Sequence, residues 1–263
     1  MPPAGGVGTG DRRLSLIWIT GASSGIGEAL ALRLARAGHE VAASARSADR
    51  LARLGDQARE AEGRIHPYPL DVTDRPAAAA LLAEIERELG PLDTAVLAAG
   101  THHPVSAGDF KAADLARLVE VNLIGTANCL EPLLRTMLAR RRGRIAIVSS
   151  VAGYRGLPTA AYYGATKAAL INLAEALKFD LDRSGVTMQL IDPGFVRTPL
   201  ADKNEFPMPF LIPAEQAAER IARGLESTSF EITFPRRFTY LLKLLRCLPY
   251  RLYFPLVAWV TRS

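Results

Sequence analysis

Short apolar runs alternate with longer segments of helical periodicity along most of the chain. Runs such as 16–19 and 145–148 are apolar at every position, as strands are when helices cover both faces of a sheet. The predicted strands are 14–20, 40–44, 64–70, 92–98, 144–149, 186–192 and 230–234. Between them, the segments 25–37, 47–61, 74–89, 109–141, 159–183 and 213–227 have the apolar spacing of helices. The alternation predicts an α/β fold built from βαβ units, with a seven-stranded parallel sheet inside a three-layer α/β/α sandwich.

The pattern shows no internal repeat and divides the chain into three unequal parts. Residues 14–235 form one predicted catalytic domain, and 263 residues with 49% hydrophobic content are enough for a soluble domain with its own core. Residues 1–13 are rich in Gly and Pro and have no apolar core segment, which indicates a flexible leader and not a signal peptide. Residues 236–263 form a basic amphipathic C-terminal extension.

The net charge of +5 comes from that extension. Six basic residues follow Glu231, the last acidic residue, and the chain before them is close to neutral. A nucleic-acid groove needs positive charge along a binding face with interleaved aromatics, so nucleic acid is not expected as a partner. Cys129 and Cys247 are the only cysteines, too few for a disulfide framework or a thiolate metal site. We therefore expect a cytoplasmic protein without a metal.

A glycine-rich loop follows the first predicted strand and opens the first helix. It contains Gly21, Ser23, Ser24, Gly25, Ile26 and Gly27. Glycines there let the backbone turn tightly and approach a pyrophosphate, whose charge the free N–H groups of a helix N-terminus attract. The loop thus predicts dinucleotide binding in a Rossmann-like fold, although its first two glycines are one residue further apart than in the common fingerprint.

The end of the second strand indicates which dinucleotide binds. A carboxylate there would bond the ribose 2′-hydroxyl and repel a 2′-phosphate, whereas this chain has Ala45 followed by Arg46. Because a guanidinium can form bidentate bonds to a phosphate, we predict NADP(H) as the cofactor, with Ser44, Ser47 or Arg50 assisting. A solvated surface arginine is the alternative interpretation.

The candidate chemistry lies in Ser149-Ser150 and in a following helix that contains Tyr163 and Lys167. These last two are four residues apart, so their side chains lie on one helix face. A nearby ammonium and a positive nicotinamide would favour the phenolate of a tyrosine, whose free pKa is about 10. Tyr163 is then a usable proton carrier.

Together, Thr20–Gly27, Asn122, Ser150, Tyr163 and Lys167 resemble the short-chain dehydrogenase/reductase family over roughly residues 14 to 200. The resemblance implies that Ser150 polarises the substrate oxygen while Tyr163 exchanges its proton. It implies that Lys167 bonds the nicotinamide ribose, and that Asn122 anchors a water that relays protons. The alternatives are structural roles: Ser149 and Ser150 only end a strand, and Asn122 only forms hydrogen bonds with the helix backbone. No catalysis is assigned to Tyr162.

The resemblance also extends the predicted cofactor site. Its further members are Asp71 and Val72 at the adenine, Ala99 and Gly100 after the fourth strand, and Pro193, Gly194, Val196 and Thr198 over the nicotinamide. The family usually has Asn-Ala-Gly where this chain has Ala98-Ala99-Gly100. The missing amide is expected to remove a structural hydrogen bond and to leave the chemistry intact.

The remaining predictions concern substrate and surroundings. The loop 199–213 is apolar, with Phe206, Met208, Phe210 and Leu211, which suggests an apolar substrate, lipid- or steroid-like; ordinary loop packing is the alternative. His102 and His103 follow the fourth strand and face solvent or line a pocket wall. The apolar run 252–260 in the extension has nine residues, too few to span a bilayer. The extension contacts a membrane peripherally at the inner face, forms a subunit contact, or caps the substrate mouth.

The sequence thus predicts an NADP(H)-dependent oxidoreductase that interconverts a ketone or aldehyde and an alcohol. Two other functions stay open: a catalytically silent NADP(H)-sensing protein, and an epimerase or dehydratase that uses the cofactor internally. A pure binding protein has no need of Tyr163, and the chain lacks a separate sugar-binding region. The resemblance implies a homodimer or homotetramer formed through the helices near 109–141 and 159–183.

Overall fold

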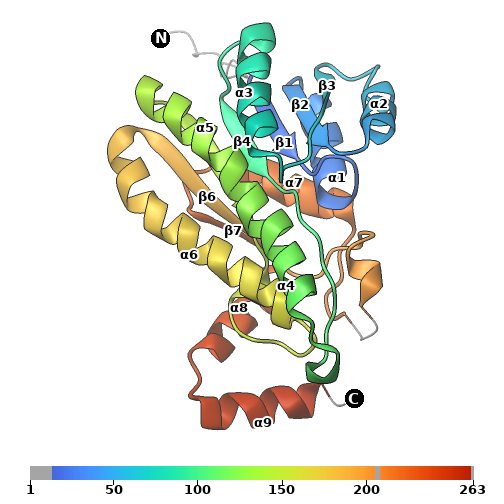
Figure 1. Cartoon of the computed structure of the whole chain (residues 1–263), viewed down its shortest axis with the longest axis vertical. Coiled ribbons are helices and arrows are strands. Elements are labelled where there is room, and N and C mark those ends of the chain that lie inside the picture. The colour runs from blue at the N-terminus through green and yellow to red at the C-terminus, as the bar shows by residue number, and fades with distance from the viewer. Residues whose placement is uncertain (1–13, 205–207, 262–263) are drawn as a thin grey trace, which may run out of the picture.

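A seven-stranded, all-parallel sheet forms the centre of the molecule (Figure 1). The computed structural model describes residues 14–204 and 208–261, so the predicted leader 1–13 lies outside the described residues. The strands are β1 (Leu16–Thr20), β2 (Glu40–Ala45), β3 (Arg64–Pro69), β4 (Thr94–Leu97), β5 (Gly143–Val148), β6 (Val186–Pro193) and β7 (Glu231–Phe234), in the order β3-β2-β1-β4-β5-β6-β7. The predicted fold class is confirmed.

Helices cover both faces of the sheet and complete the three layers (Figure 1). One core lies under α1 (Gly25–Ala35), α2 (Ala48–Gln57) and α7 (Ala214–Leu225). The other lies under α3 (Arg75–Leu89), α5 (Gly125–Arg140) and α6 (Ala161–Ser184). Because β1 lies in the middle of the sheet and packs on both sides, all five of its residues are buried, and only its last residue, Thr20, is polar.

The single helix predicted over 109–141 is interrupted. The chain forms α4 (Ala112–Val119), a π-helical turn over Glu120–Ile124, and then α5. The buried Asn122 lies in that turn, and its side chain is hydrogen-bonded to Thr101 and Thr166, outside its own helix. Single π-helical turns within helices often occur at functional sites.

The strand order reverses between β1 and β4, and a crevice opens beyond the carboxyl ends of strands at such a point. Thr20 ends β1, and its Oγ1 accepts hydrogen bonds from the backbone N–H groups of Ala98 (3.1 Å) and Ala99 (3.2 Å). This hydroxyl ties the two strands together where the family pattern would place an asparagine. The expected loss of the asparagine's own hydrogen bond stays a prediction.

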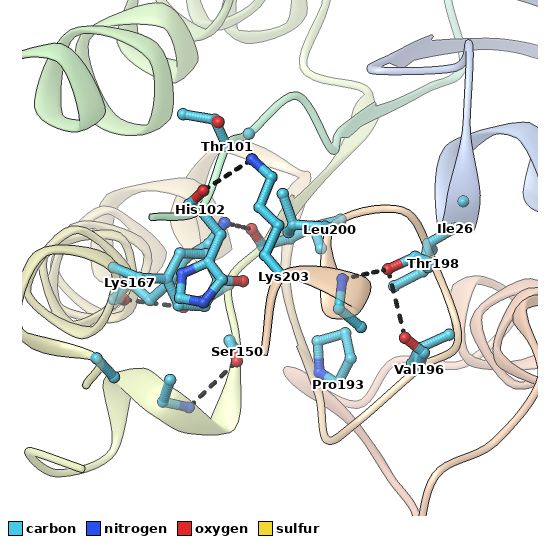
Figure 2. A pocket seen from close by; sticks show the side chains of 18 of the residues that line it. Ile26, Thr101, His102, Ser150, Lys167, Pro193, Val196, Thr198, Leu200 and Lys203 are labelled. Atoms are coloured by element: carbon cyan, nitrogen blue, oxygen red, sulfur yellow. Dashed lines mark hydrogen bonds between the residues drawn. The ribbon is translucent and has the colours of Figure 1, made fainter. Parts of the chain in front are cut away.

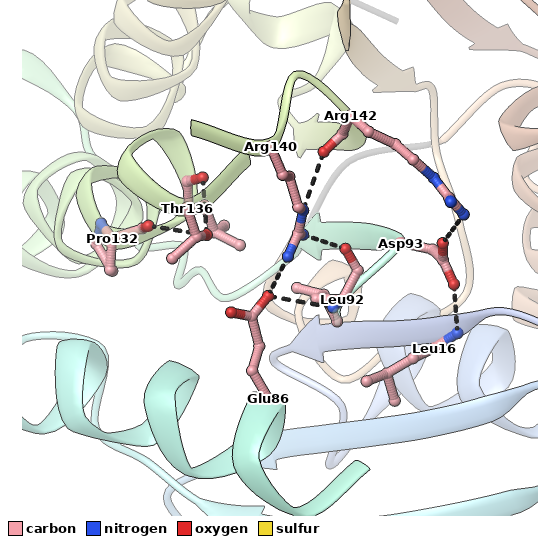
Figure 3. A network of polar contacts seen from close by, with 9 residues as sticks. Leu16, Glu86, Leu92, Asp93, Pro132, Thr136, Arg140 and Arg142 are labelled. Carbon is pink, nitrogen blue, oxygen red and sulfur yellow. Dashed lines mark hydrogen bonds and ion pairs between the residues drawn. The ribbon is translucent and has the colours of Figure 1, made fainter. Parts of the chain in front are cut away.

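A polar network fixes the amino ends of the central strands (Figure 3). Arg140 at the end of α5 pairs with Glu86 of α3 at 2.6 Å and also donates to the carbonyl of Leu92. Asp93 accepts from the backbone N–H of Leu16 at 3.1 Å and pairs with Arg142 at 2.7 Å. These contacts join α3, α5 and β1 at the edge opposite the crevice.

The extension folds as two helices, α8 (Arg236–Arg246) and α9 (Tyr250–Val260). In Figure 1, α9 runs across the end of the molecule, beyond α4 and α6. Phe238 of α8 is buried in the main core, with its ring centroid 5.5 Å from that of Phe195. The first turns of the extension are thus packed on the catalytic domain. No helix among the described residues is long and apolar enough to cross a membrane.

Candidate active site

A cavity of about 2050 Å³ lies at the carboxyl ends of the strands. Every residue predicted to bind the cofactor lines it: Gly21, Ser23, Ser24, Gly25, Ile26, Gly27, Arg46, Asp71, Val72, Ala99, Gly100, Tyr163, Lys167, Pro193, Gly194, Val196 and Thr198. Small-molecule sites typically have about 300–1,000 Å³. The cavity therefore has room for a dinucleotide and a second molecule of substantial size.

The glycine-rich loop has the close packing that a pyrophosphate site needs. A Cβ at Gly27 would lie 2.4 Å from the carbonyl oxygen of Gly21, and one at Gly21 would lie 2.8 Å from that of Ala98. Neither position tolerates a side chain without a backbone shift. Ser24 precedes α1, and its hydroxyl does not cap the helix. The first N–H groups of α1 are thus left for a phosphate, and the loop fits a dinucleotide.

The other end of the cavity carries two arginines. Arg46 and Arg50 are exposed and line it, and the N-terminus of α2 begins between them, with Ser47 Oγ accepting from the backbone N–H of Arg50 at 3.4 Å. Asp71 is fixed by hydrogen bonds from the Thr73 backbone and hydroxyl, which hold the pKa of its carboxyl below the usual value.

Asn128 of α5 supports this end from behind. Its Nδ2 donates to the carbonyl of Val72 at 2.9 Å and points away from the cavity lining. The sequence reasoning missed Asn128. The available signal was an amide on the otherwise apolar buried face of a helix, which must find a partner.

Ser150, Tyr163 and Lys167 meet at the centre of the cavity. Lys167 Nζ donates to the carbonyl of Val148 at 2.9 Å and lies 5.4 Å from the centroid of the Tyr163 ring. Ser150 Oγ accepts from the backbone N–H of Ala152 at 3.1 Å, so its own proton is left for another acceptor. Figure 2 shows Ser150 and Lys167 on the wall of the cavity that faces Pro193.

Burial controls the titration of both groups in this structure. It raises the pKa of Tyr163 to about 12, which the Ser150 hydroxyl partly offsets, and lowers the pKa of Lys167 to about 8. The sequence predicts a lowered tyrosine pKa, so the direction found is the opposite. The reason is that burial disfavours the phenolate, while the Lys167 ammonium bonds the carbonyl of Val148; the predicted effect of a bound nicotinamide stays a prediction.

Asn122 and Tyr162 lie outside the cavity lining, whereas Ser149 lines the cavity but has its hydroxyl bonded elsewhere. Asn122 Oδ1 accepts from Thr101 N at 2.7 Å, and its Nδ2 donates to Thr101 O and Thr166 Oγ1, both at 3.0 Å. Its side chain thus holds the segment after β4, and the predicted water relay stays a prediction. The Tyr162 hydroxyl donates to the Lys111 carbonyl at 3.0 Å, and Ser149 Oγ donates to the Lys167 carbonyl at 2.8 Å.

The segment after β4 is joined to the loop 199–213. His102 lines the cavity and is 8% exposed, with its Nε2 3.0 Å from Asn204 Oδ1, while Lys203 Nζ donates to the His102 carbonyl at 2.9 Å (Figure 2). Thr198 Oγ1 accepts from Ala201 N at 3.2 Å. Phe206 lies outside the described residues. Through these contacts the described parts of the loop line the same cavity as Ser150, Tyr163 and Lys167.

Asp192 is a buried charge that the sequence reasoning did not single out. It is the last residue but one of β6 and has no exposed area, and neither carboxylate oxygen has a hydrogen-bond partner among the described residues. Burial and the nearby Glu231 raise its pKa to about 7. Its charge raises the pKa values of both Tyr163 and Lys167, so Asp192 belongs to the electrostatics of the site.

Comparison with known proteins agrees with this geometry. The model of the short chain dehydrogenase family matches residues 15–207. The chain belongs to this family. It is an oxidoreductase of the NAD(P)-dependent type, and its sheet order is that of the family fold.

Relatives and solved structures resemble it over most of their length. An uncharacterized oxidoreductase of Myxococcus xanthus is 37% identical over 88% of this chain and 91% of its own. A 3beta-hydroxysteroid dehydrogenase of Mediterraneibacter gnavus is 35% identical over 75% of this chain and 71% of its own. A structure of an actinorhodin polyketide ketoreductase variant with NADPH has a TM-score of 0.76 and 28% identity, covering 84% of this chain and 95% of that one.

Proposed function

We propose that the protein is an NADP(H)-dependent reductase of apolar ketones or aldehydes, or the corresponding alcohol dehydrogenase. The observation that carries the proposal is the meeting of Ser150, Tyr163 and Lys167 beside a glycine loop that admits a pyrophosphate. The presence of Tyr163 speaks against a catalytically silent NADP(H)-sensing protein, because cofactor binding alone does not need a proton carrier. Among the residues that the structure describes, no separate sugar-binding region accompanies the nucleotide site, which speaks against the epimerase.

In reduction, the bound cofactor would supply the hydride to the carbonyl carbon. Ser150 donates a hydrogen bond to the carbonyl oxygen, and the Tyr163 hydroxyl transfers its proton to that oxygen as negative charge develops there. Lys167 stays protonated near neutral pH, since its pKa is about 8. Its Nζ has two protons beyond the one shared with Val148, which bind a ribose hydroxyl and stabilise the resulting phenolate.

The preference for NADP(H) rests on Arg46 and Arg50, two cations at the cavity wall beside the N-terminus of α2. Both can pair with a 2′-phosphate. The similar structure of the polyketide ketoreductase variant contains NADPH, which supports NADP(H) as the cofactor of this protein.

An apolar substrate is supported by the remaining walls of the cavity. These are formed by Leu157, Phe195, Met208, Phe210, Phe238, Leu241, Leu242 and Leu245. Steroid and polyketide are named for two of the relatives, and both are bulky apolar molecules. Burial of such a substrate contributes about 25 cal/mol per Å² of apolar surface.

We also propose a cytoplasmic homodimer or homotetramer formed through α4, α5 and α6. Phe179 on α6 is 72% exposed, which leaves an apolar side chain for a neighbouring subunit. Cys129 and Cys247 are both free thiols, and Cys247 is exposed, as suits a reducing compartment.

The test is NADPH oxidation over a panel of steroid, fatty and small ketones and aldehydes. We expect turnover of the apolar members, and a decrease of at least about 100-fold in kcat for Tyr163→Phe. Tyr162→Phe is the matched control: the hydroxyl is bonded to Lys111 away from the cavity, so catalysis persists while stability decreases by about 1 kcal/mol. Equal turnover by Tyr163→Phe and wild type would refute the mechanism.

A further inference from the structure

The helices α8 and α9 each have an inner side that faces the cavity and an outer side that is exposed. Their inner sides close the substrate end of the cavity with Phe238, Leu241, Leu242, Leu245, Leu256, Val257 and Val260. We call this helix pair the cover. Three of these residues, Leu241, Leu256 and Val260, are also 51%, 38% and 58% exposed. They therefore form a rim, at which the cavity opens to the surface between the helices.

The cover is held in a defined orientation by Arg155. Its guanidinium donates to the carbonyls of Leu245, Arg246 and Leu248 at 2.8, 3.0 and 2.6 Å, at the end of α8. It also lies 3.8 Å from the centroid of the Tyr253 ring of α9. A second contact joins the cover to the sheet, where Lys243 of α8 pairs with Glu231 of β7. The outer side of the cover is thus a fixed surface.

That outer side is strongly apolar. Tyr240, Leu244, Leu252, Phe254 and Trp259 are exposed and do not line the cavity, with Leu244 at 70% and Trp259 at 76%. Together with the rim residues they make eight exposed apolar side chains on two consecutive helices. So many large apolar side chains left exposed in one part of the chain indicate a contact site. Tyr and Trp are the aromatic residues enriched at membrane interfaces.

Charge decides which partner fits. No acidic residue follows Glu231 in the chain. Arg236, Arg237, Arg246 and Arg251 are exposed and form no ion pair with any residue between 14 and 204 or between 208 and 261. If two copies met through this surface, each would present only cations to the other, which opposes association. An anionic lipid surface satisfies both the arginines and the apolar side chains.

We propose that the outer side of the cover docks on an anionic membrane surface, and that the substrate enters the cavity from the lipid layer past Leu241, Leu256 and Val260. The route of entry rests on the proposed function, whereas the docking does not. Each arginine near an anionic surface strengthens binding about fivefold. The apolar residues enter the boundary between headgroups and acyl chains by about 5–10 Å.

Vesicle sedimentation of the full chain tests the docking. We expect binding to phosphatidylcholine vesicles with about one third phosphatidylglycerol, and at least tenfold weaker binding to pure phosphatidylcholine. Two double variants, Arg246→Glu with Arg251→Glu and Leu244→Ser with Trp259→Ser, each decrease binding at least about tenfold. All four positions are exposed and outside the cavity lining, so turnover of a short water-soluble ketone is unchanged.

The matched control is Arg53→Glu with Arg183→Glu, at two exposed arginines on α2 and α6. It changes the net charge equally and retains vesicle binding. The docking would be overturned if wild type did not bind anionic vesicles, or if Arg246→Glu with Arg251→Glu bound them as tightly as wild type. The docking would also be overturned if Leu244→Ser with Trp259→Ser abolished self-association and left vesicle binding unchanged, because the surface would then be a subunit contact.

Entry is tested with a long-chain ketone dissolved in the vesicles. Anionic vesicles should support at least fivefold faster NADPH oxidation than neutral vesicles with the same ketone, and only for proteins that bind them. Equal rates in both would overturn the route of entry. If no ketone on the panel is reduced, the proposed function fails while sedimentation still reports docking; if the ketones are reduced and sedimentation fails, only the docking is wrong.

Discussion

The imidazole of His102 lies edge to face against the phenol ring of Tyr163, with 4.8 Å between the ring centroids. Its Nε2 contacts Asn204, and its buried Nδ1 has no hydrogen-bond partner among the described residues. Burial lowers the pKa of His102, so the ring is neutral at neutral pH. The contact couples Tyr163, the proposed proton carrier, to the loop that contains Asn204.

We expect His102→Phe to decrease kcat/KM about fivefold, because the ring contact with Tyr163 persists while the bond that positions the loop is lost. Asn204→Ala removes the same bond from the other side and should have the same effect. Steady-state kinetics on a reduced ketone measure both. A much larger loss for His102→Phe than for Asn204→Ala would instead place Nδ1 in contact with the substrate, and no loss in either would assign the contact no role.

Exchange of Arg46 for glutamate should change the cofactor preference. A carboxylate repels a 2′-phosphate and can bond a ribose hydroxyl, so we expect the ratio of kcat/KM for NADPH to that for NADH to decrease about tenfold to 100-fold. Arg53→Glu is the control, since Arg53 is exposed on the same helix and does not line the cavity. An unchanged ratio for Arg46→Glu would contradict the assignment to NADP(H).

Asp192 should make stability depend on pH. Its folded pKa of about 7 lies above its ordinary value of 3.8, so the folded protein binds the proton more tightly than the unfolded chain. The stabilisation is fully present below about pH 3.8 and is lost as the pH increases through about 7. Glu231, Tyr154 and Lys243 share this cluster and modulate the same step.

Asp192→Asn removes that dependence. Thermal melting at a series of pH values should show the variant gaining stability relative to wild type as the pH increases from about 4 to 7. The change also removes the charge that raises the pKa of Tyr163, so alcohol oxidation should reach its plateau at a lower pH. Parallel melting curves for the two proteins across this range would show that Asp192 is ionised at low pH.

Thr20 is expected to be important for stability although it takes no part in the chemistry. Thr20→Val leaves the N–H groups of Ala98 and Ala99 without their acceptor, which should lower the free energy of unfolding by about 1–3 kcal/mol. Thr20→Ser keeps the oxygen and should retain most of the stability. Urea unfolding compares the three proteins; equal midpoints for Thr20→Val and wild type would mean that the bonds contribute nothing.

The sequence predicted the parts of the molecule that follow from local pattern. Strands buried on both faces, a glycine loop at the end of the first of them, and Tyr163 four residues before Lys167 are all readable within one or two elements. The predicted cofactor residues meet in one cavity because the carboxyl ends of parallel strands share one edge of the sheet.

What could not be predicted depends on contacts between distant segments. The side chain of Asn122 binds Thr101 and Thr166, and the pKa of Tyr163 depends on how far the surrounding elements exclude water. The amphipathic pattern of the extension predicted helices but left open what they face. Their orientation depends on Arg155, a residue with no local signal, whose partners lie some 90 positions later in the chain.

Arg155 lies on the short segment between Ser150 and Tyr163, so the same stretch of backbone carries the proposed catalytic hydroxyl and the attachment of the cover. If a shift of α8 and α9 moves this backbone, it moves the hydroxyl too, and a substrate that fixes the hydroxyl then resists that shift. Thermodynamic linkage makes this reciprocal: whatever a partner on the cover does to the affinity for substrate, the substrate must do in equal measure to the affinity for that partner.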